Sequence, residues 1–247
     1  MAPGSRIYLT RHAQAEHNVD LDYSILDAPL TPLGRKQASS LSRLLPPSIQ
    51  SRIDLLVSSP LSRTLQTTLL GYEPVISRLG GRGAVVCLPE AQECNDFPCD
   101  TGRPRSELEQ IPEFKGFNFE KLTDDWTGKQ GFYAPDPGSI AARARKVRQF
   151  LYERPEKEIV LVAHGDILRQ ITATAEAGPG VYMWRNAEMR VHRFEDEEKG
   201  GEGECFLRLE EVVEATGGYG ATSTEMEVEE RLGSAGGMNG HAANGKI

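Results

Sequence analysis

The feature that most constrains the fold is a set of four short apolar runs that are separated by segments with helical character. The runs are mostly continuous rather than alternating, as expected of strands that are buried on both faces. Strands that alternate with helices predict an α/β fold: a three-layer α/β/α sandwich with a mainly parallel central sheet. The predicted strands are Ile7–Leu9, Ile53–Val57, Ala84–Leu88 and Ile159–Ala163.

Helix starts are visible after these strands as polar caps that are followed by proline or by a new apolar stripe. Thr31 followed by Pro32 is typical of a helix start, and Pro46-Pro47 is typical of the end of that helix. The same logic places a helix start at Ser59-Pro60. The predicted helices are 32–45, opened by Thr31; 60–71, opened by Ser59; 140–154, capped by Ser139; and one that begins at Gly165-Asp166.

The remaining segments suggest one domain, residues 1–213, with an insertion and a tail. Residues 95–138, the insertion segment, carry many Pro, Gly and aromatic residues without a clear period, and we interpret them as an insertion or lid over one end of the sheet. Its aromatic side chains favour a small local core over a wall of the substrate site. Residues 205–213 are predicted to form a last strand or edge hairpin with 189–194. Residues 214–247 are predicted to be a disordered acidic, Gly-rich tail.

The charge distribution argues against a broad nucleic-acid-binding face. The whole chain carries 36 acidic and 28 basic residues, but 13 of the acidic and only 4 of the basic residues lie from Glu195 onward. The body is therefore near neutral, and no nucleic acid partner is expected. No stretch approaches the roughly 18–20 apolar residues of a membrane span, and no apolar signal region precedes the first strand. The four cysteines form no CxxC pair, so we expect free thiols and a cytoplasmic location.

Polar side chains follow four of the predicted strands or open the helices after them. Arg11-His12 follows the first strand, Arg63 lies in the opening turn of the second helix, Glu90 and Glu93 follow the third strand, and His164-Gly165 follows the fourth. The carboxyl ends of parallel strands share one edge of the sheet, where ligands bind. We therefore expect these four clusters to converge.

The residue types in these clusters fit phosphate chemistry. Arginine forks suit phosphate oxygens, and histidine serves as a nucleophile or a charge donor near neutral pH. A carboxyl group supplies a proton donor, and helix N-termini offer backbone N–H groups to an anion. No metal-ligand spacing is present, since His12 and His17 are five residues apart without an HExxH or CxxC arrangement. Transfer of a phosphoryl group to a histidine fits better than attack by metal-bound water.

Four segments, in order, resemble the histidine phosphatase superfamily, in its phosphoglycerate-mutase-like branch (branch 1). The resemblance extends from Ile7 to about Phe194, and four ordered matches in one chain are specific. It implies a phosphoglycerate-mutase-like fold and a metal-independent reaction without a cofactor. The segments are LTRHAQAEHN (Leu9–Asn18), LTPLGRKQA (Leu30–Ala38), SSPLSRTLQT (Ser58–Thr67) and LVAHGDILR (Leu161–Arg169).

The resemblance also implies roles for individual residues. His12 attacks phosphorus and becomes a phosphohistidine. A glutamate protonates the leaving oxygen and later activates water. The phosphoryl oxygens are held by Arg11, Asn18, Arg63, His164 and Gly165.

The proton donor is the position at which the sequence departs most from the family pattern. The segment LPEAQECNDFPCDTG lacks the usual nearby glycine and offers two glutamates. We favour Glu93, because its surroundings resemble a subset of fungal-looking members, with Glu90 as the alternative. Asp166 is a third and weaker candidate, because a Gly separates it from His164. Ala13 stands where Gly is common, a small change. His17 is expected to be structural or at the rim, and His192 at the surface.

These observations favour a phosphatase that hydrolyses a small-molecule phosphoester. A phosphomutase is the alternative within the same family, since the two differ in how well water is kept from the phosphoenzyme. A catalytically inactive phosphate-binding or scaffold protein is the alternative of another class, and it is disfavoured because no core residue is missing. The particular substrate and the oligomeric state are left open.

Overall fold

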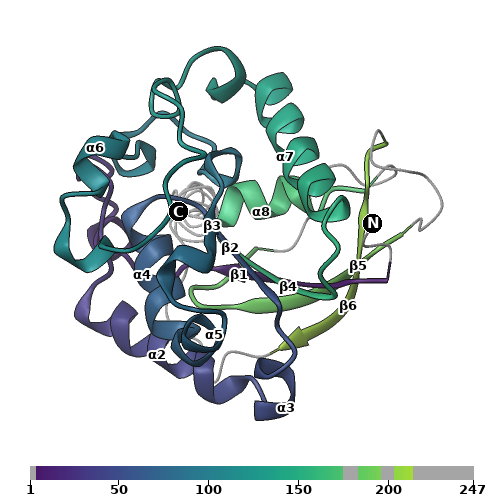
Figure 1. Ribbon diagram of the computed structural model, residues 1–247. Helices are drawn as coiled ribbons and strands as arrows, with labels where there is room; N and C mark the ends of the chain where they lie inside the picture. Colours follow the sequence, from purple (N-terminus) through teal and green to yellow (C-terminus); the bar gives the residue numbers. More distant parts are fainter. Residues whose placement is uncertain (1–3, 175–182, 196–202, 214–247) are drawn as a thin grey trace, which may run out of the picture.

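The central feature of the molecule is a six-stranded sheet with the strand order β3-β2-β4-β1-β5-β6 (Figure 1). The computed structural model describes residues 4–174, 183–195 and 203–213. Pairs β1–β4, β2–β4 and β2–β3 are parallel, whereas β1–β5 and β5–β6 are antiparallel. The strands are β1 (Arg6–Arg11), β2 (Leu55–Ser58), β3 (Val85–Cys87), β4 (Glu158–Ala163), β5 (Met189–Phe194) and β6 (Leu207–Val213). The mainly parallel sheet and the C-terminal hairpin are confirmed.

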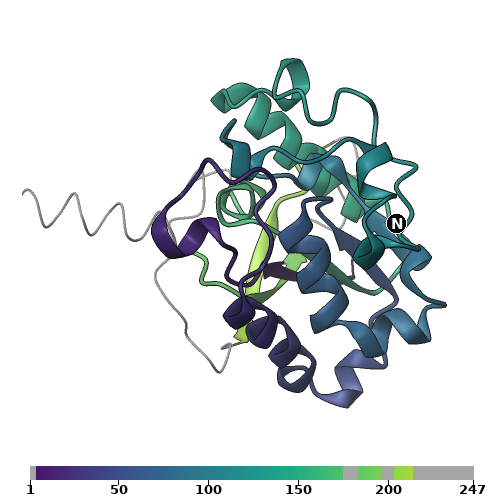
Figure 2. The same ribbon diagram turned by 90° about the vertical axis from the view of Figure 1, so that its left-hand side faces the viewer.

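Helices cover both faces of this sheet. The α-helices are α1 (His17–Asp20), α2 (Pro32–Leu44), α3 (Pro47–Gln50), α4 (Ser62–Gly71), α5 (Glu73–Arg78), α6 (Arg105–Leu108), α7 (Pro137–Tyr152) and α8 (Gly165–Ile171). Short 3-10 turns are η1 (Arg82–Ala84), η2 (Pro89–Ala91), η3 (Pro98–Asp100), η4 (Pro112–Phe114) and η5 (Gly131–Tyr133). In Figure 1, α2 and α4 lie on one side of the strands, and α7 and α8 on the other; Figure 2 shows the same separation after a 90° turn.

The side chains of β1 explain the two cores. Tyr8 faces the core that also contains α2, α4 and α5, while its neighbours Ile7 and Leu9 face the core that contains α7 and α8. Successive strand residues point to opposite faces, so a continuous apolar run indicates a strand that is covered on both sides. All three residues are at most 1% exposed. The three-layer prediction is therefore confirmed.

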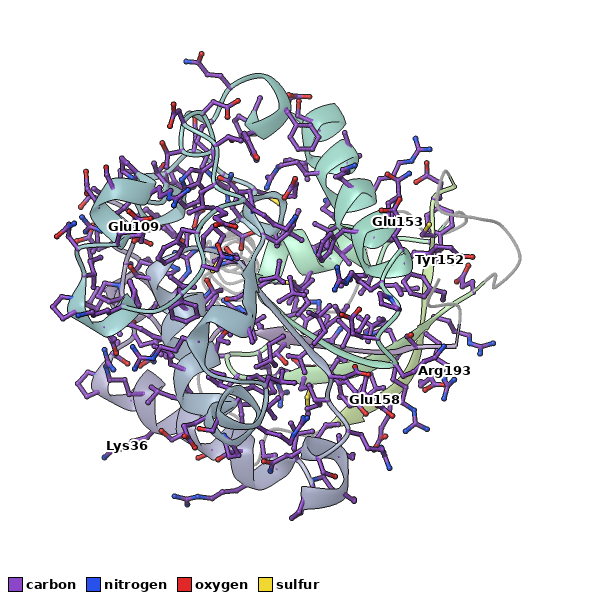
Figure 3. All side chains as sticks on the ribbon, viewed as in Figure 1. Lys36, Glu109, Tyr152, Glu153, Glu158 and Arg193 are labelled. Atoms are coloured by element: carbon purple, nitrogen blue, oxygen red, sulfur yellow. The ribbon has the colours of Figure 1, made fainter. Side chains whose placement is uncertain are left out.

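Two of the four predicted helix starts are confirmed. Thr31 caps α2, because its hydroxyl oxygen accepts a hydrogen bond from the N–H of Gly34 at 2.9 Å. Lys36, on the outer face of α2, points away from the body (Figure 3). The helix ends at Leu44, before the predicted Pro46-Pro47 stop. The last helix, α8, begins at Gly165.

The other two helix starts were predicted wrongly. Helix α4 begins at Ser62 rather than at Pro60, because the carboxylate of Asp27 accepts hydrogen bonds from the N–H and the hydroxyl of Ser62. Helix α7 begins at Pro137 rather than after Ser139, since Asp136 accepts hydrogen bonds from the N–H groups of Gly138 and Ser139. In the first case the capping residue lies far away in the sequence. In the second, an aspartate before a proline is the better cap.

Residues 95–138 contribute aromatic side chains to the core on the α2 and α4 side. Phe114, Phe117, Phe119, Trp126 and Tyr133 are at most 8% exposed, whereas Phe132 is 42% exposed. Five of these six aromatic residues are thus buried, but they join the larger core on that side of the sheet rather than a small local core. At the rim of the segment Glu109 points outward (Figure 3). The predicted tail, 214–247, lies outside the described residues.

His192 is a further correction, because it is 3% exposed rather than at the surface. Its ring stacks on Trp184 with the centroids 6.4 Å apart. The polar residues of β5 suggested a solvent-facing side, but in the structure both faces of this strand are covered. The four cysteines are free thiols, as expected. No helix in the described part of the chain combines the length and the apolar character that a membrane crossing requires.

Gly34 gives a test of how the N-terminal loop packs on α2. A Cβ atom at this position would lie 1.9 Å from the carbonyl oxygen of Gln14, a clash with backbone. Glycine-to-alanine changes normally favour a helix by up to about 1 kcal/mol. Here we expect Gly34→Ala instead to lower the free energy of unfolding by roughly 1–3 kcal/mol, the usual cost of overpacking. Urea unfolding measures this. Gly83→Ala, with no neighbouring atom closer than 3.6 Å, is the control, and an equally stable Gly34→Ala protein would contradict the packing.

Candidate active site

The site begins at the carboxyl ends of the adjacent parallel strands β1 and β4. Arg11 is the last residue of β1 and pairs with Ala163, the last residue of β4. The N–H of His12 donates to the carbonyl of Ala163 at 2.9 Å, which continues the pairing by one residue. His164 follows directly. The two imidazole rings consequently meet with their centroids 5.2 Å apart.

The hydrogen bonds of His12 define its tautomer. Its Nδ1 lies 2.7 Å from the carbonyl oxygen of Ala13, which only accepts, so Nδ1 carries the proton. Its Nε2 accepts from Nε of Arg63 at 3.2 Å. Nε2 therefore has the lone pair that a nucleophile needs, and it points toward Arg63.

Burial and neighbouring cations keep both histidines neutral. The loss of water around His12, followed by the charges of Arg63 and Arg11, holds the pKa of His12 well below its usual value. Burial, then Arg63, lowers the pKa of His164 in the same way. His12 is 1% exposed and His164 is fully buried. A neutral imidazole is the form that can attack phosphorus.

Arg63 is brought to His12 by helix α4. Its guanidinium group is 1% exposed and uses all three nitrogens. Nε faces His12, Nη1 donates to the carbonyl of Cys99 at 2.5 Å, and Nη2 donates to Oδ1 of Asp100 at 2.8 Å. Cys99 and Asp100 belong to η3 in the insertion segment.

Arg11 enters the site from β1 and contacts the segment before β5. Its Nη1 donates to the carbonyl of Trp184 at 2.6 Å. Gly165 lies against the same guanidinium group, since a Cβ atom at 165 would be 3.3 Å from Nε of Arg11. A small residue at 165 thus lets the start of α8 approach the arginine closely.

Glu93 lies at the N-terminus of α8. Its Oε1 accepts from the N–H groups of Cys94 and Ile167, both at 2.9 Å, and its Oε2 accepts from the N–H of Asp166 at 3.2 Å. The residue is 8% exposed. The structure therefore places Glu93 on the same edge of the sheet as His164, joined through the first turn of α8.

The two other candidate proton donors are placed differently. Asp166 is next to Glu93, and burial together with the Glu93 charge raises its pKa to about 6, while its carboxylate is 3.5 Å from Arg169. Glu90 lies in η2 and lines a cavity of about 270 Å³ with Leu88, Lys121, Lys146 and Phe150. None of the arginines and histidines described above lines that cavity.

Asn18 is buried beside the His12 loop. Its Oδ1 accepts from the N–H of Ala15 at 3.0 Å, and its amide nitrogen lies 3.0 Å from Nε2 of His17. Asn186 donates to the carbonyl of His12 at 3.3 Å and, at 3.4 Å, to Oδ1 of Asn18. The ring of His17 is 6.0 Å from that of His12, and burial lowers its pKa to about 2. His17 is thus a buried support of this loop, rather than a rim residue.

Several residues of the site were missed from the sequence. The hydroxyl of Ser59 lies 2.8 Å from Nε2 of His164, so this serine contacts the histidine instead of capping a helix. Asp100 holds Arg63. Lys129 donates to the carbonyl of Glu93 at 3.1 Å, and burial lowers its pKa to about 8. Arg143 of α7 is buried and donates to the carbonyls of Gln92 and Glu93. Asp100 and Lys129 lie in the insertion segment, where the sequence has no period, and Arg143 lies in the predicted helix 140–154, whose pattern does not show which carbonyls this side chain meets.

Together these side chains form a compact cationic site around a neutral histidine. Two arginines that meet a buried imidazole can hold a phosphoryl group against its nitrogen and offset charge during transfer. Within residues 4–174, 183–195 and 203–213, no group of three or more His, Cys, Asp or Glu side chains is arranged to hold a metal ion.

Comparison with known proteins identifies the family of the chain. Residues 7–202 match the model of the histidine phosphatase superfamily (branch 1). A Schizosaccharomyces pombe protein named "probable phosphatase" is 30% identical over 167 residues, which cover 66% of this chain and 75% of that protein. Phosphoglycerate mutase-like protein 1 of Arabidopsis thaliana is 32% identical over 194 residues, covering 66% of this chain and 68% of the relative.

Solved structures share the fold at lower identity. The alpha-ribazole phosphatase of Shigella flexneri superposes with a TM-score of 0.54 at 20% identity, covering 87% of this chain and 100% of that one. A phosphoserine phosphatase mutant of Entamoeba histolytica, solved with phosphoserine, gives a TM-score of 0.53 at 18% identity, covering 86% and 98%. At these identities the likeness establishes a phosphoglycerate-mutase-like fold.

Proposed function

Because the chain belongs to branch 1 of the histidine phosphatase superfamily, we propose that it hydrolyses a small-molecule phosphomonoester through a phosphohistidine on His12. The observation that carries the proposal is the state of His12. Its proton is on Nδ1, its lone pair is on Nε2, and two arginines lie beside it. A phosphoryl group placed against Nε2 meets both a nucleophile and positive charge.

The reaction proceeds in two displacements. The phosphoryl group takes over the N–H of Arg63 that Nε2 of His12 accepts in the free protein. Nε2 then attacks phosphorus, the bond to the ester oxygen breaks, and Glu93 gives its proton to the leaving alcohol. The ionised Glu93 then takes a proton from water, whose oxygen attacks phosphorus and breaks the P–N bond. His12 and protonated Glu93 are regenerated, and inorganic phosphate leaves. Contacts to the phosphoryl oxygens come from Arg11, Asn18, Arg63, His164 and Gly165.

Hydrolysis is favoured over phosphoryl transfer to a second hydroxyl. The S. pombe relative is named as a phosphatase, whereas the Arabidopsis relatives are named as phosphoglycerate mutase-like. The mutase is therefore a second candidate. Product analysis with a phosphoglycerate separates the two activities: a phosphatase releases inorganic phosphate, whereas a mutase moves the phosphoryl group to another hydroxyl of the same molecule. Turnover of any phosphoester would contradict the third alternative, a catalytically inactive scaffold protein.

The substrate class is a small phosphorylated metabolite. Structural relatives were solved with phosphoserine and with 3-phosphoglyceric acid, each a small anion with one phosphoester. We infer a cytoplasmic location from the four free cysteines, which fit a reducing compartment. A screen of phosphorylated metabolites against the purified protein identifies the substrate by phosphate release.

We expect the purified protein to hydrolyse a generic aryl phosphate without added metal and to keep its rate in EDTA. Charge on the transferring phosphoryl group is offset by the two arginines in this proposal, so no metal ion is needed. Phosphate release is measured with and without EDTA, and with Mg²⁺ restored. A rate that disappears in EDTA and returns with Mg²⁺ would contradict the mechanism.

A further inference from the structure

The contact between Arg63 and the insertion segment includes a buried ion pair. Nη2 of Arg63 donates to Oδ1 of Asp100 at 2.8 Å, and the two side chains are 1% and 6% exposed. The carbonyl of Cys99, the preceding residue, accepts from Nη1 of the same guanidinium group. The insertion segment thus contacts both terminal nitrogens of Arg63, while the third nitrogen, Nε, faces His12.

Such an ion pair is a poor way to stabilise a fold. Taking both charges out of water costs several kcal/mol, and their attraction returns this only with good geometry and further hydrogen bonds. Asp100 also lies near the negative charge of Glu93. A buried carboxylate beside a predicted anion site, near a second carboxylate, therefore calls for a reason other than stability.

The direction of the three nitrogens supplies that reason. An arginine side chain has several rotatable bonds, and a guanidinium group that is held only at Nε can swing away from His12. Two acceptors on Nη1 and Nη2 fix the plane of the group, since guanidinium N–H bonds point in fixed in-plane directions. The anchored group then presents its Nε side to the position where a phosphoryl group meets Nε2 of His12.

We propose that Asp100 is a positioning residue that, with the carbonyl of Cys99, anchors Arg63 in the orientation that binds the phosphoryl group. The inference rests on the proposed function and extends it: the insertion segment completes the phosphate site, rather than only covering it. Asp100 acts through Arg63 and does not contact the substrate.

If Asp100 competed with phosphate for Arg63 instead of anchoring it, removing Asp100 would change anion affinity in the opposite direction. If its carboxylate occupied Arg63 in place of phosphate, removing it would free the arginine and strengthen anion binding. If it anchors Arg63, removing it weakens anion binding. Affinity for a phosphate analogue therefore separates the two roles.

The test compares Asp100→Ala and Asp100→Asn with wild type and with Asp96→Ala. Asp96 is an exposed acid of the same segment, so its replacement removes the same charge without touching Arg63. For each protein, the affinity for vanadate is measured by calorimetry. The values of kcat and KM are measured with an aryl phosphate, and Tm is measured by thermal unfolding. Vanadate binding does not require turnover. If the wild-type protein binds vanadate but hydrolyses no phosphoester, the proposed function is contradicted, and the vanadate affinities of the Asp100 variants still test this inference.

We expect Asp100→Ala to weaken vanadate binding about 10- to 100-fold, the usual range for a lost charged hydrogen bond, and to lower kcat/KM comparably. Asp100→Asn keeps an acceptor oxygen and is expected to lose roughly 2- to 10-fold. Asp96→Ala keeps wild-type affinity. Vanadate affinity that is unchanged or tighter in Asp100→Asn would overturn the proposal, and this variant decides the matter if Asp100→Ala does not fold.

Discussion

Replacing His12 with alanine is expected to lower turnover by on the order of 10⁴-fold or more, the scale seen when a nucleophile is removed. The alanine variant keeps Arg11, Arg63 and His164, so it should still bind vanadate. The methyl side chain of alanine at position 12 cannot form a bond to phosphorus, so the phosphohistidine intermediate cannot form. Steady-state rates with an aryl phosphate measure the loss.

The covalent intermediate gives the same prediction a direct readout. A phosphate-labelled substrate mixed rapidly with wild type and quenched in denaturant should label one peptide, which contains His12. His17→Gln is the matched control: His17 is a buried histidine of the same loop, 6.0 Å from His12 by ring centroid, and its replacement should preserve the label. Full activity in His12→Ala, or a label on another residue, would contradict the assignment of the nucleophile.

The layers of the fold could be predicted because burial on both faces leaves a local trace. Ile7, Tyr8 and Leu9 read as a continuous apolar run, and in the structure they divide between the two cores. The positions of Arg11-His12 and His164 followed from the same reasoning, since parallel strands end at one edge. These residues lie at a strand end or one position beyond it, so the position of the strand end determines where they lie.

Features that depend on distant residues could not be predicted. The start of α4 is set by Asp27, which is 35 residues before Ser62. The environment of Arg63 is set by Asp100, and that of Glu93 by Lys129 and Arg143. Each partner is polar, and all of them except Arg143, which lies in α7, belong to segments without an apolar period. A single sequence shows that such residues are present but does not show which carbonyl or carboxylate they meet.

Glu93 and Glu90 are a choice that the sequence leaves open, and the two side chains have different surroundings in the structure. Glu90 and Glu93 are three residues apart and equally plausible by type. The structure places Glu93 at the first turn of α8, the helix that follows His164, and Glu90 at a separate cavity with two lysines. The carbonyl of Glu93 accepts from both Lys129 and Arg143, which fix the backbone of this residue. A fixed backbone is what a proton donor needs for a constant distance to the leaving oxygen.

We therefore expect Glu93→Gln to lower kcat by roughly 10²- to 10⁴-fold with an alkyl phosphate, the usual range for a general acid. Glutamine keeps an acceptor oxygen for the N–H groups of α8 but has no acidic proton. With an aryl phosphate, whose leaving group departs without full protonation, the first displacement should remain fast. Loss of the base then slows hydrolysis of the phosphoenzyme, so a burst of one aryl alcohol per site should precede a slow phase.

The burst also distinguishes the three carboxylic acids, because it requires the loss of one group that serves both steps. Glu90→Gln and Asp166→Asn are matched controls that remove a neighbouring acid while preserving size, and each is expected to keep kcat within about tenfold of wild type with both substrates. A burst with aryl phosphate and a large loss with alkyl phosphate in Asp166→Asn would instead transfer the role to Asp166, whose pKa burial raises to about 6. If Glu93→Gln hydrolysed both substrates at the wild-type rate, then Glu93 would serve only to cap α8, a role that glutamine can fill.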